Sequence, residues 1–265
     1  MKAKNVARKP FCLIMVGLLC TMTFVGCNSH KVQRIQLVSG NTYVIEKDVD
    51  EVVITGDPDN KTLWGVCIQI ASRKKDLVLT LDNVKFQAKA EQPAISCSDT
   101  SFSLTVRFKG ACTVRGGDGC DGADGTSGAL AFPTNWWGKG GHDGQYALAC
   151  GKVIFERMEA ESCLLLYGGG GGDGGDAGNS DRAMALALIT DKPNGGKGGN
   201  GASALLCREC TYEKDDVKFV AGSGGRGGKS GYCKVLGGLL GLFGLGKMYG
   251  HDGATGTTPK AIAYR

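Results

Sequence analysis

The stretch Gly116-Gly117-Asp118-Gly119-Cys120-Asp121 is the best guide to the fold, because it returns as Gly171-Gly172-Asp173-Gly174-Gly175-Asp176 further along the chain. A third glycine cluster, Gly224-Gly225-Arg226-Gly227-Gly228-Lys229, follows after a nearly equal interval. Of the 44 glycines, 38 lie between Gly116 and Gly256, so the clusters are concentrated in one half of the chain. Self-similarity at a nearly fixed spacing is the primary sign of a repeat architecture, and the sequence therefore predicts a solenoid.

A second glycine cluster lies inside each repeat. Residues 138–144 return as residues 196–201 and again as residues 246–253. Two clusters in a period of about 55 residues predict two similar units of about 27 residues in each repeat. Glycine reaches positive φ without a steric penalty and allows backbones to approach closely, so we expect the clusters to form loops on one side of the solenoid. Packed polyglycine-II helices are a poor expectation for the main scaffold, because each cluster has only about six to ten residues.

The sequence before the glycine clusters has the pattern of β-strands. Apolar residues alternate with other residues at Val66, Ile68 and Ile70, at Leu77, Leu79 and Leu81, and at Phe102, Leu104, Val106 and Phe108. This period of two is typical of strands with one buried face. Turn signals such as Gly56-Asp57-Pro58-Asp59-Asn60 separate the runs. No run of helical periodicity stands out after the N-terminal segment, so the sequence predicts an all-β chain.

Part of this region resembles the right-handed parallel β-helix repeats of bacterial surface and secreted proteins in its pattern of residue types. The resemblance is carried by the runs Leu79–Phe86, Leu104–Gly110 and Thr113–Gly117. The resemblance implies a single-stranded parallel β-helix, with residues 36–115 as N-terminal coils and residues 116–265 as glycine-rich repeats that continue the same solenoid. It also implies a leaning toward glycans, which some members of that group bind or cleave. A β-sandwich with glycine-rich insertions is the alternative architecture.

The N-terminus has the composition of an export signal. Four bases and no acid lie in residues 1–10, and a mainly apolar stretch follows at Phe11–Val25. The sequence Phe24-Val25-Gly26-Cys27 resembles the lipobox of bacterial lipoproteins. That resemblance implies a cleaved signal at 1–26, fatty-acid chains such as palmitate on Cys27, and a linker to residue 35. The alternative is an ordinary secretory signal with a chance cysteine.

A lipid anchor would place the chain on the bacterial cell membrane or outer membrane, facing the periplasm or the exterior. Removal of the signal takes four of the 31 Lys and Arg residues and none of the 26 acids, which leaves a net charge of +1. That balance excludes an electrostatic case for a nucleic-acid partner.

Nine cysteines remain beyond Cys27, an odd number that cannot pair completely within one chain. Several lie in apolar runs, which favours buried thiols over a disulfide framework. The pair Cys207 and Cys210 has redox-motif spacing. Positions three apart on one strand face opposite sides, however, so we expect this pair to have a structural role and to share neither a disulfide nor a metal.

Four aspartates have the spacing of a calcium site. Asp118, Asp121, Asp173 and Asp176 fit the first part of the calcium-binding β-roll nonapeptide, Gly-Gly-x-Gly-x-Asp-x-U-x. The apolar position of that motif holds Ala123 or Gly178, and the motifs are not in tandem. Calcium is therefore a candidate cofactor, and the alternative is solvated turns whose aspartates make local hydrogen bonds.

The strongest candidates for a binding surface are aromatic residues. Trp136 and Trp137 are adjacent, and with Tyr167 they form a candidate ligand-binding set that would stack on sugar rings. The interpretation that follows is a non-enzymatic structural or binding module, acting in adhesion or glycan binding through polysaccharide or another host or envelope surface component. A β-helix polysaccharide lyase or hydrolase is the alternative, and a purely architectural envelope protein is a third hypothesis.

Overall fold

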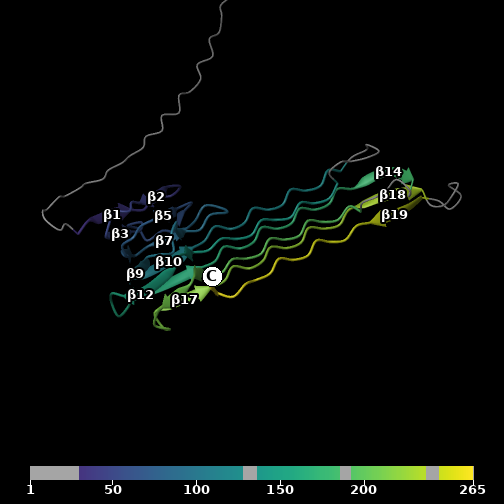
Figure 1. Cartoon of the computed structure of the whole chain (residues 1–265). Helices are drawn as coiled ribbons and strands as arrows, with labels where there is room; N and C mark the ends of the chain where they lie inside the picture. The colour runs from purple at the N-terminus through teal and green to yellow at the C-terminus, as the bar shows by residue number, and fades with distance from the viewer. Residues whose placement is uncertain (1–29, 128–135, 186–191, 237–244, 265) are drawn as a thin grey trace, which may run out of the picture.

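The computed structural model describes residues 30–127, 136–185, 192–236 and 245–264. The described residues contain strands but no helix, and most strands form three parallel sheets that enclose a common interior (Figure 1). The chain visits the three sheets in turn, so the fold is a three-sided parallel β-solenoid. The prediction of an all-β parallel β-helix is confirmed, and the alternative β-sandwich is wrong, because sandwiches pack antiparallel sheets.

The first sheet has six strands in the order β1-β3-β6-β9-β12-β16. Their bounds are β1 Val32–Gln36, β3 Glu51–Thr55, β6 Leu77–Asp82, β9 Ser103–Lys109, β12 Lys152–Arg157 and β16 Glu209–Thr211. β1 thus begins inside the segment that the sequence analysis assigned to a linker.

The second sheet has the order β4-β7-β10-β13-β17, and the third has the order β2-β5-β8-β11-β15-β20. The second comprises β4 Leu63–Trp64, β7 Lys85–Gln87, β10 Ala111–Arg115, β13 Cys163–Tyr167 and β17 Val217–Val220. The third comprises β2 Thr42–Ile45, β5 Cys67–Ile70, β8 Ile95–Cys97, β11 Leu148–Ala149, β15 Leu205–Cys207 and β20 Ile262–Tyr264.

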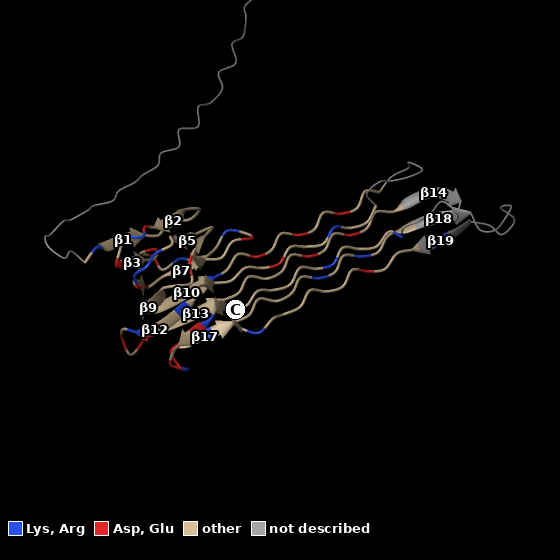
Figure 2. Cartoon of the chain, in the orientation of Figure 1, with Lys and Arg blue, Asp and Glu red and all other residues tan. Residues whose placement is uncertain are grey.

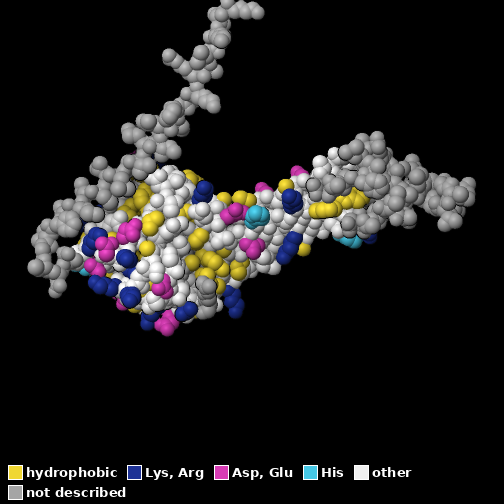
Figure 3. All heavy atoms as spheres, turned by 45° about the horizontal axis from the view of Figure 1, so that its top comes forward, with side chains coloured by type: hydrophobic (Ala, Val, Ile, Leu, Met, Phe, Trp, Pro, Cys, Tyr) yellow, Lys and Arg dark blue, Asp and Glu magenta, His cyan; other side chains and the backbone are white. Residues whose placement is uncertain are grey.

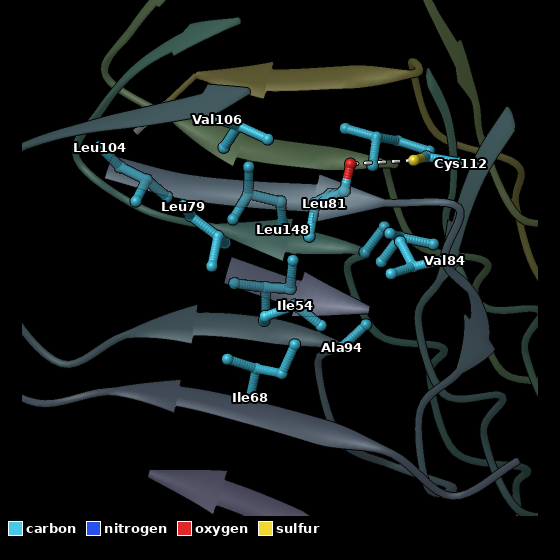
Figure 4. Close-up of a cluster of buried hydrophobic side chains, with 14 of the residues drawn as sticks. Ile54, Ile68, Leu79, Leu81, Val84, Ala94, Leu104, Val106, Cys112 and Leu148 are labelled. Atoms are coloured by element: carbon cyan, nitrogen blue, oxygen red, sulfur yellow. Dashed lines mark hydrogen bonds between the residues drawn. The ribbon is translucent and has the colours of Figure 1, made fainter. Parts of the chain in front are cut away.

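The core fills the space between the three sheets. Alternate residues of β9 are buried, as the period of two predicts, and Leu104 and Phe108 have no exposed surface. Figure 4 shows side chains from several turns, among them Ile54, Leu79 and Leu148, meeting in this interior. Successive turns stack with similar residues in register, so the apolar side chains of each turn are covered by those of the next.

The turns have two different lengths. Glu51 pairs with Val78 and closes a short turn, whereas Lys152 pairs with Glu209 and closes a turn about twice as long. Each long repeat is one turn of the solenoid with a long insertion between the second and third sheets. The prediction of two similar solenoid units per repeat is therefore wrong, because the insertion between the second and third sheets leaves the solenoid and each repeat contributes only one turn.

These insertions form a narrow projection, here called the glycine bundle, that extends from one corner of the solenoid (Figures 1 and 3). Three outgoing segments, 116–127, 168–179 and 221–231, lead away from the second sheet. Three returning segments, 136–146, 192–203 and 250–260, lead back to the third sheet. At about 3.1 Å per residue, an outgoing segment such as 168–179 spans about 37 Å.

A small sheet lies at the distal end of the glycine bundle. It consists of β14 Ser180–Ala185, β18 Tyr232–Leu236 and β19 Leu245–Tyr249 in the order β14-β18-β19. β14 and β18 are parallel, and β18 and β19 are antiparallel. The distal end therefore lies far from the solenoid core.

Candidate functional site: the glycine bundle and its distal end

Backbone hydrogen bonds in the glycine bundle repeat every third residue. The N–H groups of Gly119, Gly122 and Gly125 donate to the carbonyls of Gly170, Asp173 and Asp176, at 2.8, 2.7 and 2.7 Å. A second series crosses between the layers, as where Gly172 N–H donates to the His142 carbonyl at 2.9 Å. Three residues per turn with bonds only between segments is the geometry of polyglycine-II helices.

The main scaffold is the β-solenoid, as expected, but the six described segments of the glycine bundle do pack as polyglycine-II helices. The reason is that the segments are longer than their glycine clusters. Alanine, serine and lysine also occupy triplet positions where no backbone lies opposite. The solenoid holds both ends of the hairpins in register, so short segments do not have to find their partners alone.

Close approach of backbones explains the glycines. A Cβ added to Gly172 would lie 2.0 Å from the Cys120 carbonyl oxygen, and one added to Gly199 would lie 1.9 Å from that of His142. Positive φ is not the reason: among the described glycines only Gly40, Gly65 and Gly110 have it, and all three lie outside the bundle. Glycine is required in the bundle by space and not by backbone conformation.

The backbone pattern divides each segment into triplets of three residues. The third residue of such a triplet can carry a side chain that faces outward and accepts a hydrogen bond from the next segment. Asp121 Oδ1 accepts a hydrogen bond from the Asp173 N–H at 2.7 Å, and Asp173 Oδ1 accepts one from the Arg226 N–H at 2.7 Å. Asp176 Oδ1 does the same for the Lys229 N–H at 2.7 Å. The alternative hypothesis, in which these aspartates make local hydrogen bonds within turns, is wrong, because donor and acceptor belong to neighbouring segments of successive repeats.

Asp118 belongs to the same series but lies next to the solenoid. Its Oδ1 accepts from the Gly170 N–H at 2.7 Å and from Arg115 at 2.9 Å, and its Oδ2 accepts from Gln87 at 2.9 Å. The four aspartates proposed for calcium are thus divided along two neighbouring segments. Among the described residues no group of three His, Cys, Asp or Glu side chains has the arrangement of a metal site.

Two residues of this series, Asp124 and Asn179, were not predicted from the sequence. Asp124 Oδ1 accepts from the Asp176 N–H at 2.8 Å, and Asn179 Oδ1 accepts from the Tyr232 N–H at 3.0 Å. Reading the sequence in steps of three from Asp118 would have found the first, and the same step from Asp173 would have found the second. Figure 2 shows the positions of charged residues at intervals along the segments.

The structure does not bring the three predicted aromatic residues together. The Trp136 carbonyl accepts from the Gly178 N–H at 2.7 Å, near the distal end, and the Trp136 side chain is buried. Tyr167 ends β13, at the other end of the same outgoing segment as Gly178 and about 34 Å from it along the segment. Trp137 is 42% exposed, so it alone of the set is an exposed aromatic side chain near the distal end.

Other aromatic residues join Trp137 at the distal end. Tyr249 is 58% exposed, and its ring lies 6.0 Å from that of Tyr232. Lys247 Nζ lies 4.1 Å from the centre of the Tyr232 ring, within cation–π range. The antiparallel pairing of β18 with β19 brings these three residues together, a contact that sequence spacing does not reveal.

A shallow depression of about 570 Å³ lies at a solenoid corner and has mixed charge. Its lining residues are Lys47, Asp48, Ser72, Arg73, Lys74, Lys75 and Asp99. A hydrogen bond from Lys31 lowers the pKa of Asp48, and hydrogen bonds from Ser101 lower the pKa of Asp99. Both carboxyl groups are therefore ionised near neutral pH.

The expectation that Cys207 and Cys210 face opposite sides is wrong. Arg208 lies at a corner of the solenoid, between β15 in the third sheet and β16 in the first. The corner turns the chain, so both cysteines face the interior. Alternation along a single strand does not apply across a corner.

Comparisons with family models, with curated proteins and with solved structures find no match to this chain. Cys27 lies outside the described residues. No helix within the described part of the chain is long and apolar enough to cross a membrane. The chemistry of the glycine bundle and its distal end must therefore carry the functional argument.

Proposed function

We propose that this chain is a membrane-anchored cell-envelope lipoprotein that acts as a non-enzymatic binding module for glycans. In this proposal, fatty-acid chains on Cys27 hold the protein on the membrane, the solenoid is the base, and the glycine bundle is a stiff projection. The distal end of the bundle presents the aromatic residues that bind sugar. A partner in adhesion would be a polysaccharide of the envelope or of another surface.

One observation carries the proposal: the glycine bundle extends about 37 Å from the solenoid and is hydrogen-bonded along its length. A single glycine-rich hairpin would be flexible, since glycine loses the most conformational entropy on ordering. Six segments with bonds at every third residue restrict that freedom. The bundle supports the idea that the distal residues are held away from the solenoid surface.

The distal side chains have suitable chemistry for sugar. Trp137 and Tyr249 are exposed aromatic rings, which stack on the apolar faces of pyranose rings while their polar atoms stay in water. Lys139 and Lys192 are exposed on the neighbouring returning segments and supply donors to sugar hydroxyl or carboxylate groups. No deep pocket is needed for this mode of binding, which suits polymers better than small metabolites.

The test is an array of neutral and acidic oligosaccharides probed with the full chain in detergent. Trp137→Ala is expected to lower binding about tenfold, the equivalent of about 1.4 kcal/mol of lost stacking. Trp64→Ala is the matched control, because Trp64 is 60% exposed but lies on β4 of the solenoid. Absence of binding across the array, or an equal loss in both variants, would contradict glycan binding at the distal end.

The alternative of glycoside hydrolysis has less support. Such enzymes need one carboxyl group that stays protonated as a general acid beside one that is ionised. The two carboxylates of the corner depression, Asp48 and Asp99, both have lowered pKa values. Because the pKa of each residue is lowered, neither carboxyl group is kept protonated to act as the general acid.

The anchor has its own test. Growth with a labelled fatty acid is expected to label the full chain and to leave Cys27→Ser unlabelled and released from membranes. Cys12→Ser, inside the expected signal, is the control that keeps the label. Equal membrane association of both variants would contradict lipidation at Cys27.

A further inference from the structure

Three cysteines lie side by side on successive turns of the third sheet. Ala149 pairs with Ser96 on one neighbouring turn and with Leu206 on the other. Cys150 therefore lies next to Cys97 and Cys207, and its N–H donates to the Leu206 carbonyl at 2.9 Å. The three positions form a thiol column at the corner that leads into the first sheet.

A fourth cysteine enters the column from the other side of the corner. Cys210 pairs with Val153, which has no exposed surface, so the Cys210 side chain faces the same interior. Cys207 and Cys210 thus face the same interior from the two sides of the corner, and both residues are thiols in the structure. Because β16 is the last strand of the first sheet, Cys210 is only partly covered.

We propose that Cys207 and Cys210 form a disulfide across the Arg208 corner, and that Cys97 and Cys150 stay reduced. This inference is independent of glycan binding. A disulfide joins side chains that lie close together, and these two face the same interior from the two sides of one corner. Neighbours in register on parallel strands are about 4.8 Å apart, whereas the Cβ atoms of a disulfide are about 3.8 Å apart, so Cys97 and Cys150 do not fit without movement.

The reaction consumes one small disulfide such as oxidised glutathione. The Cys210 thiol, which is the more exposed, loses its proton and attacks one sulfur of the oxidant, releasing one small thiol and leaving a mixed disulfide on Cys210. Cys207 then loses its proton and attacks the Cys210 sulfur, releasing the second small thiol. The chain loses two hydrogen atoms, and the oxidant gains them.

Arg208 makes the product easy to recognise. Trypsin cleaves after Arg208, between the two cysteines, so only a disulfide keeps the two peptides together. The full chain is reduced, incubated with oxidised glutathione, alkylated under denaturing conditions, digested and weighed by mass spectrometry. The expected product is a linked pair of peptides carrying Cys207 and Cys210, with Cys97 and Cys150 alkylated.

Two variants test the order of attack. Cys207→Ser is expected to stop at glutathione on Cys210, whereas Cys210→Ser leaves Cys207 without glutathione, since Cys207 has no exposed surface. Cys163→Ser is the matched control, because Cys163 lies on β13 outside the column, and it keeps the link. Circular dichroism verifies that each variant keeps its strands. Alkylation of both Cys207 and Cys210 after oxidation, or a link from Cys150 to Cys207, would overturn the proposal.

Discussion

Replacing Gly172 with alanine tests the packing of the glycine bundle directly. The new Cβ would lie 2.0 Å from the Cys120 carbonyl oxygen and 2.4 Å from the carbonyl carbon. Real Cβ atoms stay more than about 3 Å from such atoms, so the two segments must separate by about 1 Å. Gly172 N–H donates to His142 and its carbonyl accepts from Gly199, and both bonds lengthen when the segment moves.

The expected cost follows from these contacts. Two weakened hydrogen bonds contribute about 1 kcal/mol each, and overpacking in a tightly packed region adds about 1–3 kcal/mol. We therefore expect Gly172→Ala to destabilise the bundle by about 3–5 kcal/mol. Gly170→Ala is the matched control, because its nearest neighbour, Asp118 Oδ1, is at 3.5 Å. That variant is expected to be neutral or to stabilise the chain by up to about 1 kcal/mol, since alanine lowers the entropy of the unfolded chain.

Hydrogen–deuterium exchange read by mass spectrometry is the suitable assay, because repeat proteins open locally and a single melting temperature does not describe them. Gly172→Ala should raise exchange in peptides from residues 168–179 and 192–203 and leave those from residues 77–109 unchanged. Equal protection in Gly172→Ala and Gly170→Ala would refute the triplet packing, because only one of these glycines faces a neighbouring backbone.

Three other perturbations have expected outcomes. Asp173→Ala should make the Arg226 amide exchange about tenfold faster by removing its acceptor, whereas Asp173→Asn keeps an oxygen in place and most of the protection. Phe86→Ala, at a side chain 1% exposed, should lower the free energy of unfolding of the solenoid by about 3–5 kcal/mol in urea titrations; a cost below about 1 kcal/mol would contradict its place in the core. Burial raises the pKa of Cys97 and of Cys210 to about 12, above the unfolded value of about 8.5, so native-state alkylation of both should rise about tenfold per pH unit between about pH 7 and pH 10. Because burial keeps these thiols protonated to a higher pH in the folded chain than in the unfolded chain, their contribution to stability is complete below about pH 8.5 and is lost as the pH rises toward about 12. An alkylation rate that levels off near about pH 9 would show that the thiols have ordinary pKa values.

Alternation of apolar residues was sufficient to predict the strands of the solenoid. Leu77, Leu79 and Leu81 alternate in the sequence and are fully buried in β6, because side chains on a strand point to opposite faces whatever the tertiary context. The repeated glycine clusters likewise predicted stacked repeats. These conclusions depend on local geometry and on periodicity, both of which are present in one dimension.

The candidate site was less accessible from the sequence. Trp136 and Trp137 are identical neighbours in the sequence, yet one is 6% exposed and the other 42% exposed, because only the packing of the segments distinguishes them. Tyr249 and Lys247 meet Tyr232 only through the pairing of β18 with β19. Exposure and long-range contact are properties of the folded chain, and no local pattern encodes them.

An all-β solenoid of stacked repeats, with its glycines in phase, was already specified by the order of the residues. The role of those glycines in polyglycine-II segments became clear only in three dimensions, since the need for glycine at Gly172 arises from the Cys120 carbonyl on the preceding outgoing segment. The shared facing of Cys207 and Cys210 likewise depends on the folded chain, because the corner at Arg208 reverses the facing that strand alternation predicts. Local periodicity sets which face of a strand is apolar, whereas the position of corners and the distance between segments depend on how all the turns stack together.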